Sequence, residues 1–175
     1  MELIKDGLLF SEPWHRRPPG ETILKFEEEF AKWCGVKYAL AHTNGTSALQ
    51  AALFAVGVGP GDEVIVPSYS IYFSIGPILA CNAVPVFCDV DPETMSADPT
   101  DIATRVTPRT KAILVVHMNG MPCAMDDIRE ITDKHDLAIV EDACGAPWAT
   151  YNGTTLGTIG HAGAFSIKKI FNWVA

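Results

Sequence analysis

Residues 112–142 have the sequence AILVVHMNGMPCAMDDIREITDKHDLAIVED, and this stretch decides the fold. An apolar run at Ala112–Val116 opens it, and a second run at Leu137–Val140 comes just before its end. Between them lies Met125–His135, which is long enough for a helix. Strands that are apolar throughout and alternate with helices favour a parallel sheet covered on both faces.

The same alternation continues toward the N-terminus. Apolar strands are predicted at Glu63–Val66 and Val84–Phe87, and helix-length segments at Ser70–Cys81 and Pro99–Val106. The predicted fold class is therefore α/β, a three-layer sandwich with a mostly parallel central sheet. Right-handed crossovers place the carboxyl ends of the strands along one edge, where open α/β sheets bind ligands. The residues at or just past those ends are Pro67, Ser68, Asp89, His117 and Asp142.

The N-terminal part is expected to depart from this alternation. Residues 1–20 are predicted to form an irregular arm, and residues 21–175 a single domain. A first helix is predicted from apolar residues at helical spacing, namely Ile23, Phe26, Phe30 and Trp33. Gly35 suits the position just past its end. A short strand is then predicted at Tyr38–Ala41, and a second helix begins near Ser47.

Composition excludes several classes of protein. Hydrophobic residues make up 48% of the 175 residues and charged residues 19%, which is typical of a globular domain. The formal net charge of −8 disfavours a nucleic-acid partner, because phosphate contacts need Lys and Arg. No membrane span and no signal peptide is recognised, so a cytoplasmic protein with reduced cysteines is expected. The five histidines lack metal-ligand spacing, so no metal site is predicted.

The segment Thr43–Ala48, which precedes the second predicted helix, favours a phosphate site. A helix N-terminus offers unpaired N–H groups and the positive end of the helix dipole. Gly45 lets the backbone approach a ligand closely, and Thr46 and Ser47 add hydroxyl donors. The alternative interpretation is that Thr46 or Ser47 only caps the helix.

Two further motifs suit chemistry that uses pyridoxal phosphate (PLP). Asp142 ends an apolar strand, where a carboxylate can keep a pyridinium nitrogen protonated, although it could equally cap the next turn or bind a metal. Ser166 ends a small-residue strand and can contact a phosphate. Lys168 and Lys169 follow and can supply the Schiff-base amine, although adjacent lysines are often a solvated surface pair. His117 is either a site residue or a hydrogen-bonded structural histidine.

Seven blocks of the sequence carry a family resemblance. They are Lys25–Ala31, Asn44–Leu49, Gly59–Pro67, Pro85–Pro92, Thr107–Ile113, Glu141–Ala143 and Gly163–Ser166. Together they resemble the DegT/DnrJ/EryC1/StrS family of fold-type-I PLP aminotransferases, which aminate nucleotide-linked keto-sugars and some cyclitols. The resemblance implies the large domain of that fold, with the C-terminal domain absent.

The resemblance also implies roles for matched residues. Gly45, Thr46 and Ser47 correspond to the phosphate-binding turn, Asp142 to the partner of the pyridine nitrogen, and Ser166 to a phosphate-contacting serine. The implied reaction moves an amino group from Glu or Gln to a keto-sugar or a cyclitol ketone. In this family a second subunit completes the site, so a homodimer is implied.

Three positions depart from the family pattern. Phe171 stands where the family has its Schiff-base lysine, so Lys168 and Lys169 are the candidate catalytic residues. Ile71 stands where an aromatic residue stacks on the cofactor ring, so the neighbouring Tyr72 is the candidate for that role. Gly145 replaces a common Gln or His.

Two rival interpretations remain at this point. The chain is expected to be incomplete, so it could be a truncated remnant that lost its lysine and its activity. A nicotinamide-dependent oxidoreductase is the second rival, but it needs a glycine-rich loop after the first strand. The glycines of residues 57–61 instead precede a predicted strand, which is the wrong side for cradling a pyrophosphate.

Overall fold

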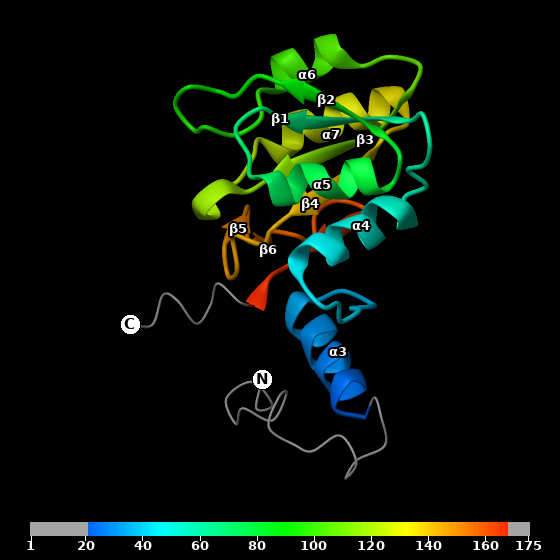
Figure 1. Ribbon diagram of the computed structural model, residues 1–175. Coiled ribbons are helices and arrows are strands. Elements are labelled where there is room, and N and C mark those ends of the chain that lie inside the picture. Colours follow the sequence, from blue (N-terminus) through cyan, green and yellow to red (C-terminus); the bar gives the residue numbers. More distant parts are fainter. Residues whose placement is uncertain (1–20, 168–175) are drawn as a thin grey trace. The chain divides into compact units, whose positions relative to one another are not determined.

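The computed structural model describes residues 21–167, and the chain divides into two compact units, residues 1–42 and 43–175. In the first unit, α3 (Glu21–Cys34) confirms the predicted helix (Figure 1). Its aromatic residues stack along one face: the ring centroids of Phe26 and Phe30 are 5.6 Å apart, and those of Phe30 and Trp33 are 5.4 Å apart. Gly35 follows the helix with φ +70°, a conformation that suits glycine.

The predicted strand at Tyr38–Ala41 is wrong, because this segment is irregular in the structure. Tyr38 and Leu40 are about three-quarters exposed, at 74% and 76%. The N–H of Ala41 donates to the Glu27 carboxylate at 2.7 Å and so has a side-chain partner instead of a strand partner. A short apolar run forms a strand only where a neighbouring strand pairs with it, and the described residues provide none here.

The second unit contains a five-stranded parallel sheet in the order β2–β1–β3–β4–β7. Its strands are β1 (Glu63–Pro67), β2 (Val84–Cys88), β3 (Thr110–Val116), β4 (Ala138–Asp142) and β7 (Ala162–Ala164). The predicted strands are thus confirmed to within a few residues. All five run the same way, so their carboxyl ends lie along one edge of the sheet.

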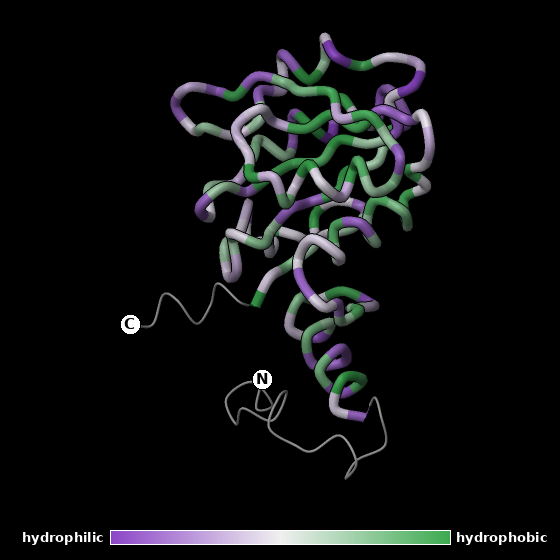
Figure 2. Tube along the Cα trace, viewed as in Figure 1, coloured by the Kyte–Doolittle hydropathy of each residue, from purple (hydrophilic) through white to green (hydrophobic). Residues whose placement is uncertain are grey.

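Helices cover both faces of this sheet, as the ribbon shows (Figure 1). The helices are α4 (Gly45–Ala55), α5 (Tyr72–Ala80), α6 (Pro99–Arg105) and α7 (Met125–His135). Alternate strand residues face opposite sides. One core cluster joins α4 and α5 to Val64, Val66, Leu114 and Val140. The other joins α6 and α7 to Ile65, Ile113, Val115 and Ile139. The three-layer sandwich is therefore confirmed, and Figure 2 shows hydrophobic residues along its central strands.

Smaller elements connect the strands near the carboxyl edge. A 3₁₀ turn, η1 (Met118–Gly120), follows β3, and a two-stranded hairpin of β5 (Thr150–Tyr151) and β6 (Thr154–Thr155) follows β4. No helix within the described part of the chain is long and apolar enough to cross a membrane.

Glycines allow the turn at residues 157–160 to lie directly on the sheet. A Cβ on Gly163 would collide with the carbonyl oxygen of Gly157, and a Cβ on Gly160 would lie 2.8 Å from that of Ile139. Gly157 itself has φ +88°. Any side chain at Gly163 would therefore push the turn away from β7.

We predict that Gly163→Ala destabilises the fold by about 3 kcal/mol, because backbone must move to admit the methyl group. Gly59→Ala is the matched control, since its Cβ would meet nothing nearer than the Asp62 carboxylate at 4.0 Å. Urea denaturation followed by circular dichroism measures both. Equal stability of the two variants would contradict this account of the turn.

Candidate functional site

Three segments of the chain meet at the carboxyl edge of the sheet: the start of α4, the residues after β4 and the residues after β7. A Cβ on Gly45 would lie 2.7 Å from the Sγ of Cys144 and 3.3 Å from the Cβ of Ser166. Only glycine allows so close an approach without displacing the cysteine. The predicted turn and the predicted serine, far apart in sequence, are therefore neighbours in space.

The start of α4 is held by Asn44, which is the N-cap residue. Asn44 Oδ1 accepts from the Ser47 N–H at 2.8 Å. In return, the Ser47 hydroxyl accepts from the Asn44 N–H at 3.3 Å and donates to the Asn44 carbonyl at 2.9 Å. This reciprocal arrangement is a capping box. The helix thus begins at Gly45, earlier than predicted, and Ser47 assists the cap while Asn44 provides it.

Several donors at this turn have no hydrogen-bond partner among residues 21–167. They are the backbone N–H groups of Gly45 and Thr46 and the hydroxyls of Thr46 and Ser166. The first N–H groups of a helix lack intrahelical acceptors and point toward its N-terminus, beside the positive end of the helix dipole. An anion placed there would meet the two N–H groups, with Ser166 beside them.

Asp142, the last residue of β4, is only 5% exposed. Its Oδ1 accepts from the backbone N–H of Cys144 at 3.0 Å, and its Oδ2 accepts from the Ser74 hydroxyl at 2.6 Å. The acid therefore does cap the turn that follows its strand, as one of the sequence interpretations expected. Since Cys144 also contacts Gly45, a single residue separates the carboxylate from the turn at α4.

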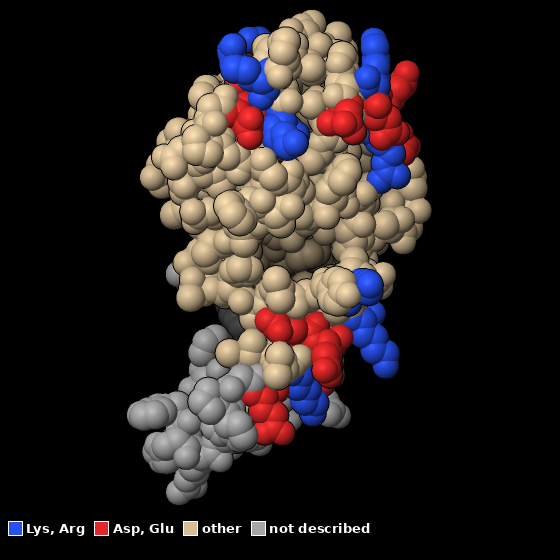
Figure 3. Space-filling model, turned by 90° about the vertical axis from the view of Figure 1, so that its right-hand side faces the viewer, with Lys and Arg blue, Asp and Glu red and all other residues tan. Residues whose placement is uncertain are grey.

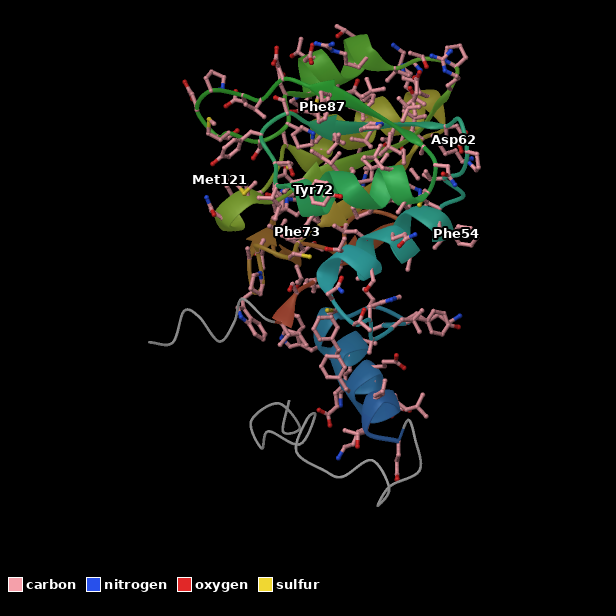
Figure 4. The ribbon with its side chains drawn as sticks, in the orientation of Figure 1. Phe54, Asp62, Tyr72, Phe73, Phe87 and Met121 are labelled. Carbon is pink, nitrogen blue, oxygen red and sulfur yellow. The ribbon has the colours of Figure 1, made fainter. Side chains whose placement is uncertain are left out.

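Tyr72 is the other predicted site residue that the structure describes. Tyr72, the first residue of α5, is 72% exposed. Its ring lies along its own helix, 3.6 Å from where Gly76 would carry a Cβ, and meets the Phe73 ring edge-on at 6.0 Å; the two aromatic side chains lie at the start of α5 in Figure 4. Lys168 and Lys169 lie outside the described residues.

Glu141, next to Asp142, faces the other side of the sheet and is fully buried. One carboxylate oxygen accepts from the His117 Nε2 at 3.0 Å and from the Gly157 N–H at 2.7 Å. The other accepts from the N–H groups of Ile159 at 2.7 Å and Gly160 at 2.6 Å. Through these hydrogen bonds Glu141 holds the turn at residues 157–160 against the sheet.

His117 is a structural histidine, which confirms one of the two sequence interpretations. It is fully buried, and its Nδ1 accepts from the Cys123 N–H at 3.3 Å, so the ring proton lies on Nε2 and is donated to Glu141. Burial opposes the charge on Glu141, but the hydrogen bonds from His117, Gly160 and Gly157 outweigh it and lower the pKa of this carboxyl group.

Sequence reasoning overlooked Glu141 and Ser74 as partners in this region. The one available signal was the side-chain alternation along a strand. Adjacent acids at a strand end must face opposite layers, so only one of Glu141 and Asp142 could face a ligand. Nothing in the local sequence indicated that Ser74, on a helix 68 residues away, would bond to Asp142.

Comparisons with known proteins concern the family and the fold of the chain. The DegT/DnrJ/EryC1/StrS aminotransferase family matches residues 9–171. The GDP-perosamine synthase of Caulobacter vibrioides is 48% identical over 147 residues, which are 84% of this chain and 40% of that protein. The chain thus spans about two fifths of the length of this relative.

Solved structures show the same fold. The X-ray structure of the aminotransferase from Psychrobacter cryohalolentis superposes with a TM-score of 0.81 at 41% identity, covering 94% of this chain and 41% of that one. The structure of NtdA from Bacillus subtilis, with bound cofactor PMP, gives 0.79 at 34% identity, covering 89% of this chain and 36% of that one.

We predict that Glu141→Gln destabilises the fold by about 3 kcal/mol at pH 7, because an amide would place an NH₂ group against buried N–H donors. Exposed Glu130→Gln is the control. Urea denaturation of both variants tests this, and a loss no larger than that of the control would contradict it.

The effect of Glu141→Gln should depend on pH. Because the folded pKa of Glu141 lies below its ordinary value of 4.5, the unfolded chain takes up the proton first as the pH falls. The stability gap between wild type and variant should be complete above pH 4.5 and shrink below it. Denaturation midpoints measured from pH 7 downward report the gap.

Proposed function

Because this chain belongs to the DegT/DnrJ/EryC1/StrS aminotransferase family, we propose that residues 21–175 form the cofactor-binding domain of a PLP-dependent aminotransferase. One observation carries the proposal: donors at the start of α4 that have no partner among the described residues lie at the same edge of the sheet as the carboxylate of Asp142. A phosphorylated pyridine ring has an anionic group at one end and a basic nitrogen in its ring, so this pair of features fits it.

The phosphate would be held at the start of α4. Its oxygens could accept from the N–H groups of Gly45 and Thr46 and from the hydroxyls of Thr46 and Ser166, which have no partner within residues 21–167. Ser47 has a different part, since its hydroxyl is engaged with Asn44 and keeps the turn in shape. Charge-assisted hydrogen bonds of this kind are about twice as strong as neutral ones.

The ring nitrogen would be held by Asp142. Each carboxylate oxygen has two lone pairs, and among the described residues each accepts one hydrogen bond, so acceptor capacity remains there for a pyridinium N–H. The side chain is almost fully shielded from water, which strengthens its interaction with a positive charge. When bound, the cofactor supplies an electron sink and carries the amino group between donor and acceptor.

Lys168 and Lys169 remain the candidates for the amine that binds the cofactor covalently and moves a proton at the substrate carbon. We propose glutamate or glutamine as amino donor and a keto-sugar, nucleotide-linked, or a cyclitol ketone as acceptor. The similarity to GDP-perosamine synthase supports the sugar-linked class. A cytoplasmic location suits such an enzyme.

A second copy of the chain is the proposed protein partner. Large apolar side chains are exposed on α4 and α5: Phe54 at 76%, Tyr72 at 72%, Phe73 at 59% and Leu79 at 52%. Large apolar side chains that are exposed on a soluble protein favour an interaction site. On the face seen in Figure 3, charged side chains form separate groups, and the uppermost groups border a broad uncharged surface.

We predict that the chain binds pyridoxamine phosphate and that Asp142→Asn and Thr46→Val each weaken binding by a factor of roughly 10 or more, because each removes a hydrogen bond to a charged group. Thr104→Val is the control, since Thr104 bonds to Asp101 on α6. Isothermal titration calorimetry measures all four proteins. Indistinguishable affinities would remove the support for this site.

Covalent attachment of the cofactor to a lysine distinguishes an active aminotransferase from an inactive remnant. We predict that incubation with pyridoxal phosphate followed by borohydride leaves the pyridoxyl group on Lys168 or Lys169, which peptide mass spectrometry can locate. The paired variants Lys168→Arg and Lys169→Arg identify which lysine reacts, and Lys134→Arg on α7 is the control. Binding without a labelled lysine would favour the inactive remnant.

A further inference from the structure

Ser74 lies in the first turn of α5 and is the one fully buried polar side chain of that helix. Its neighbours Tyr72 and Phe73 are 72% and 59% exposed. The start of α5 therefore exposes two aromatic side chains to solvent and buries the Ser74 hydroxyl. A hydroxyl buried among apolar groups costs free energy unless it forms a hydrogen bond. Its partner is Asp142, at 2.6 Å.

The direction of this hydrogen bond is fixed by chemistry. A carboxylate has no hydrogen to give, so the Ser74 hydroxyl must donate to Oδ2 of Asp142. The Cys144 N–H donates to Oδ1 at 3.0 Å. With one donor on each oxygen, the carboxylate cannot rotate about its χ2 bond without breaking a hydrogen bond.

We propose that Ser74 is a positioning residue for the cofactor site. It fixes the plane of the Asp142 carboxylate so that the oxygen lone pairs left free are presented to a pyridinium N–H beyond the end of β4. This role rests on the proposed function. A hydrogen bond that only joined α5 to β4 would affect stability alone, whereas a positioning bond also controls the protonation of the ring nitrogen.

The test uses the full chain and pyridoxamine phosphate carrying ¹⁵N in its ring. The ¹⁵N chemical shift reports whether the ring nitrogen is protonated, and calorimetry gives the affinity. We expect Ser74→Ala to weaken binding roughly 10-fold and to move the midpoint of ring protonation to lower pH, because one charge-assisted hydrogen bond is lost and the carboxylate is free to turn. Ser74→Thr, which keeps the hydroxyl, should restore both.

Ser96→Ala is the matched control, since Ser96 is also buried and its hydroxyl has no partner among the described residues. Thermal denaturation of every variant separates folding from binding. If Ser74→Ala lowers the melting temperature but leaves affinity and ¹⁵N shift at wild-type values, the bond is structural and the positioning role is overturned.

The two proposals fail in different ways. If Asp142→Asn alters the ¹⁵N shift and Ser74→Ala does not, Ser74 loses its role while the cofactor site stands. If the wild-type chain does not bind pyridoxamine phosphate, or if Asp142→Asn binds it with an unchanged ¹⁵N shift, the proposed cofactor site itself is wrong and the role of Ser74 falls with it.

Discussion

The architecture of the site depends on the contact of Gly45 with Cys144 and Ser166. A methyl group on Gly45 would lie 2.7 Å from the Cys144 sulfur and 3.3 Å from the Cβ of Ser166, so a larger residue would displace the cysteine side chain and crowd the serine. With glycine, the first N–H groups of the helix, the serine and the acid at the strand end come together. Asn44 supports this contact by fixing where the helix begins.

Two adjacent acids, Glu141 and Asp142, face opposite sides of the sheet and form separate hydrogen-bond networks. Glu141 faces α7 and the turn at residues 157–160, where its oxygens accept hydrogen bonds from His117 and three backbone N–H groups. Asp142 faces α5, where Ser74 and Cys144 hold it. The buried hydrogen bonds of Glu141 thus hold the end of β4 in place. Asp142, on the opposite face of the same strand end, therefore has a defined position. Rigid elements are the usual means of holding a binding group in place.

The sequence allowed the parallel sheet and most of its helices to be predicted, because apolar strands and helical spacing are local signals. It also indicated the turn at Gly45 and the acid Asp142, since strand ends meet at one edge. The features that could not be predicted depend on contacts between residues that the local sequence pattern does not reveal. The apolar segment at Tyr38–Ala41 has no pairing strand among residues 21–167. Asn44, and not Thr46 or Ser47, is the N-cap residue of α4. The bond from Ser74 to Asp142 joins distant segments and has no local pattern.

The central claim is that one ligand touches the start of α4 and Asp142 at the same time. A crystal structure of the full chain with pyridoxamine phosphate tests it most directly. The account predicts the phosphate on the N–H groups of Gly45 and Thr46, with the ring nitrogen within hydrogen-bonding distance of the Asp142 carboxylate. A phosphate bound away from that turn, or a ring nitrogen facing another group, would contradict it.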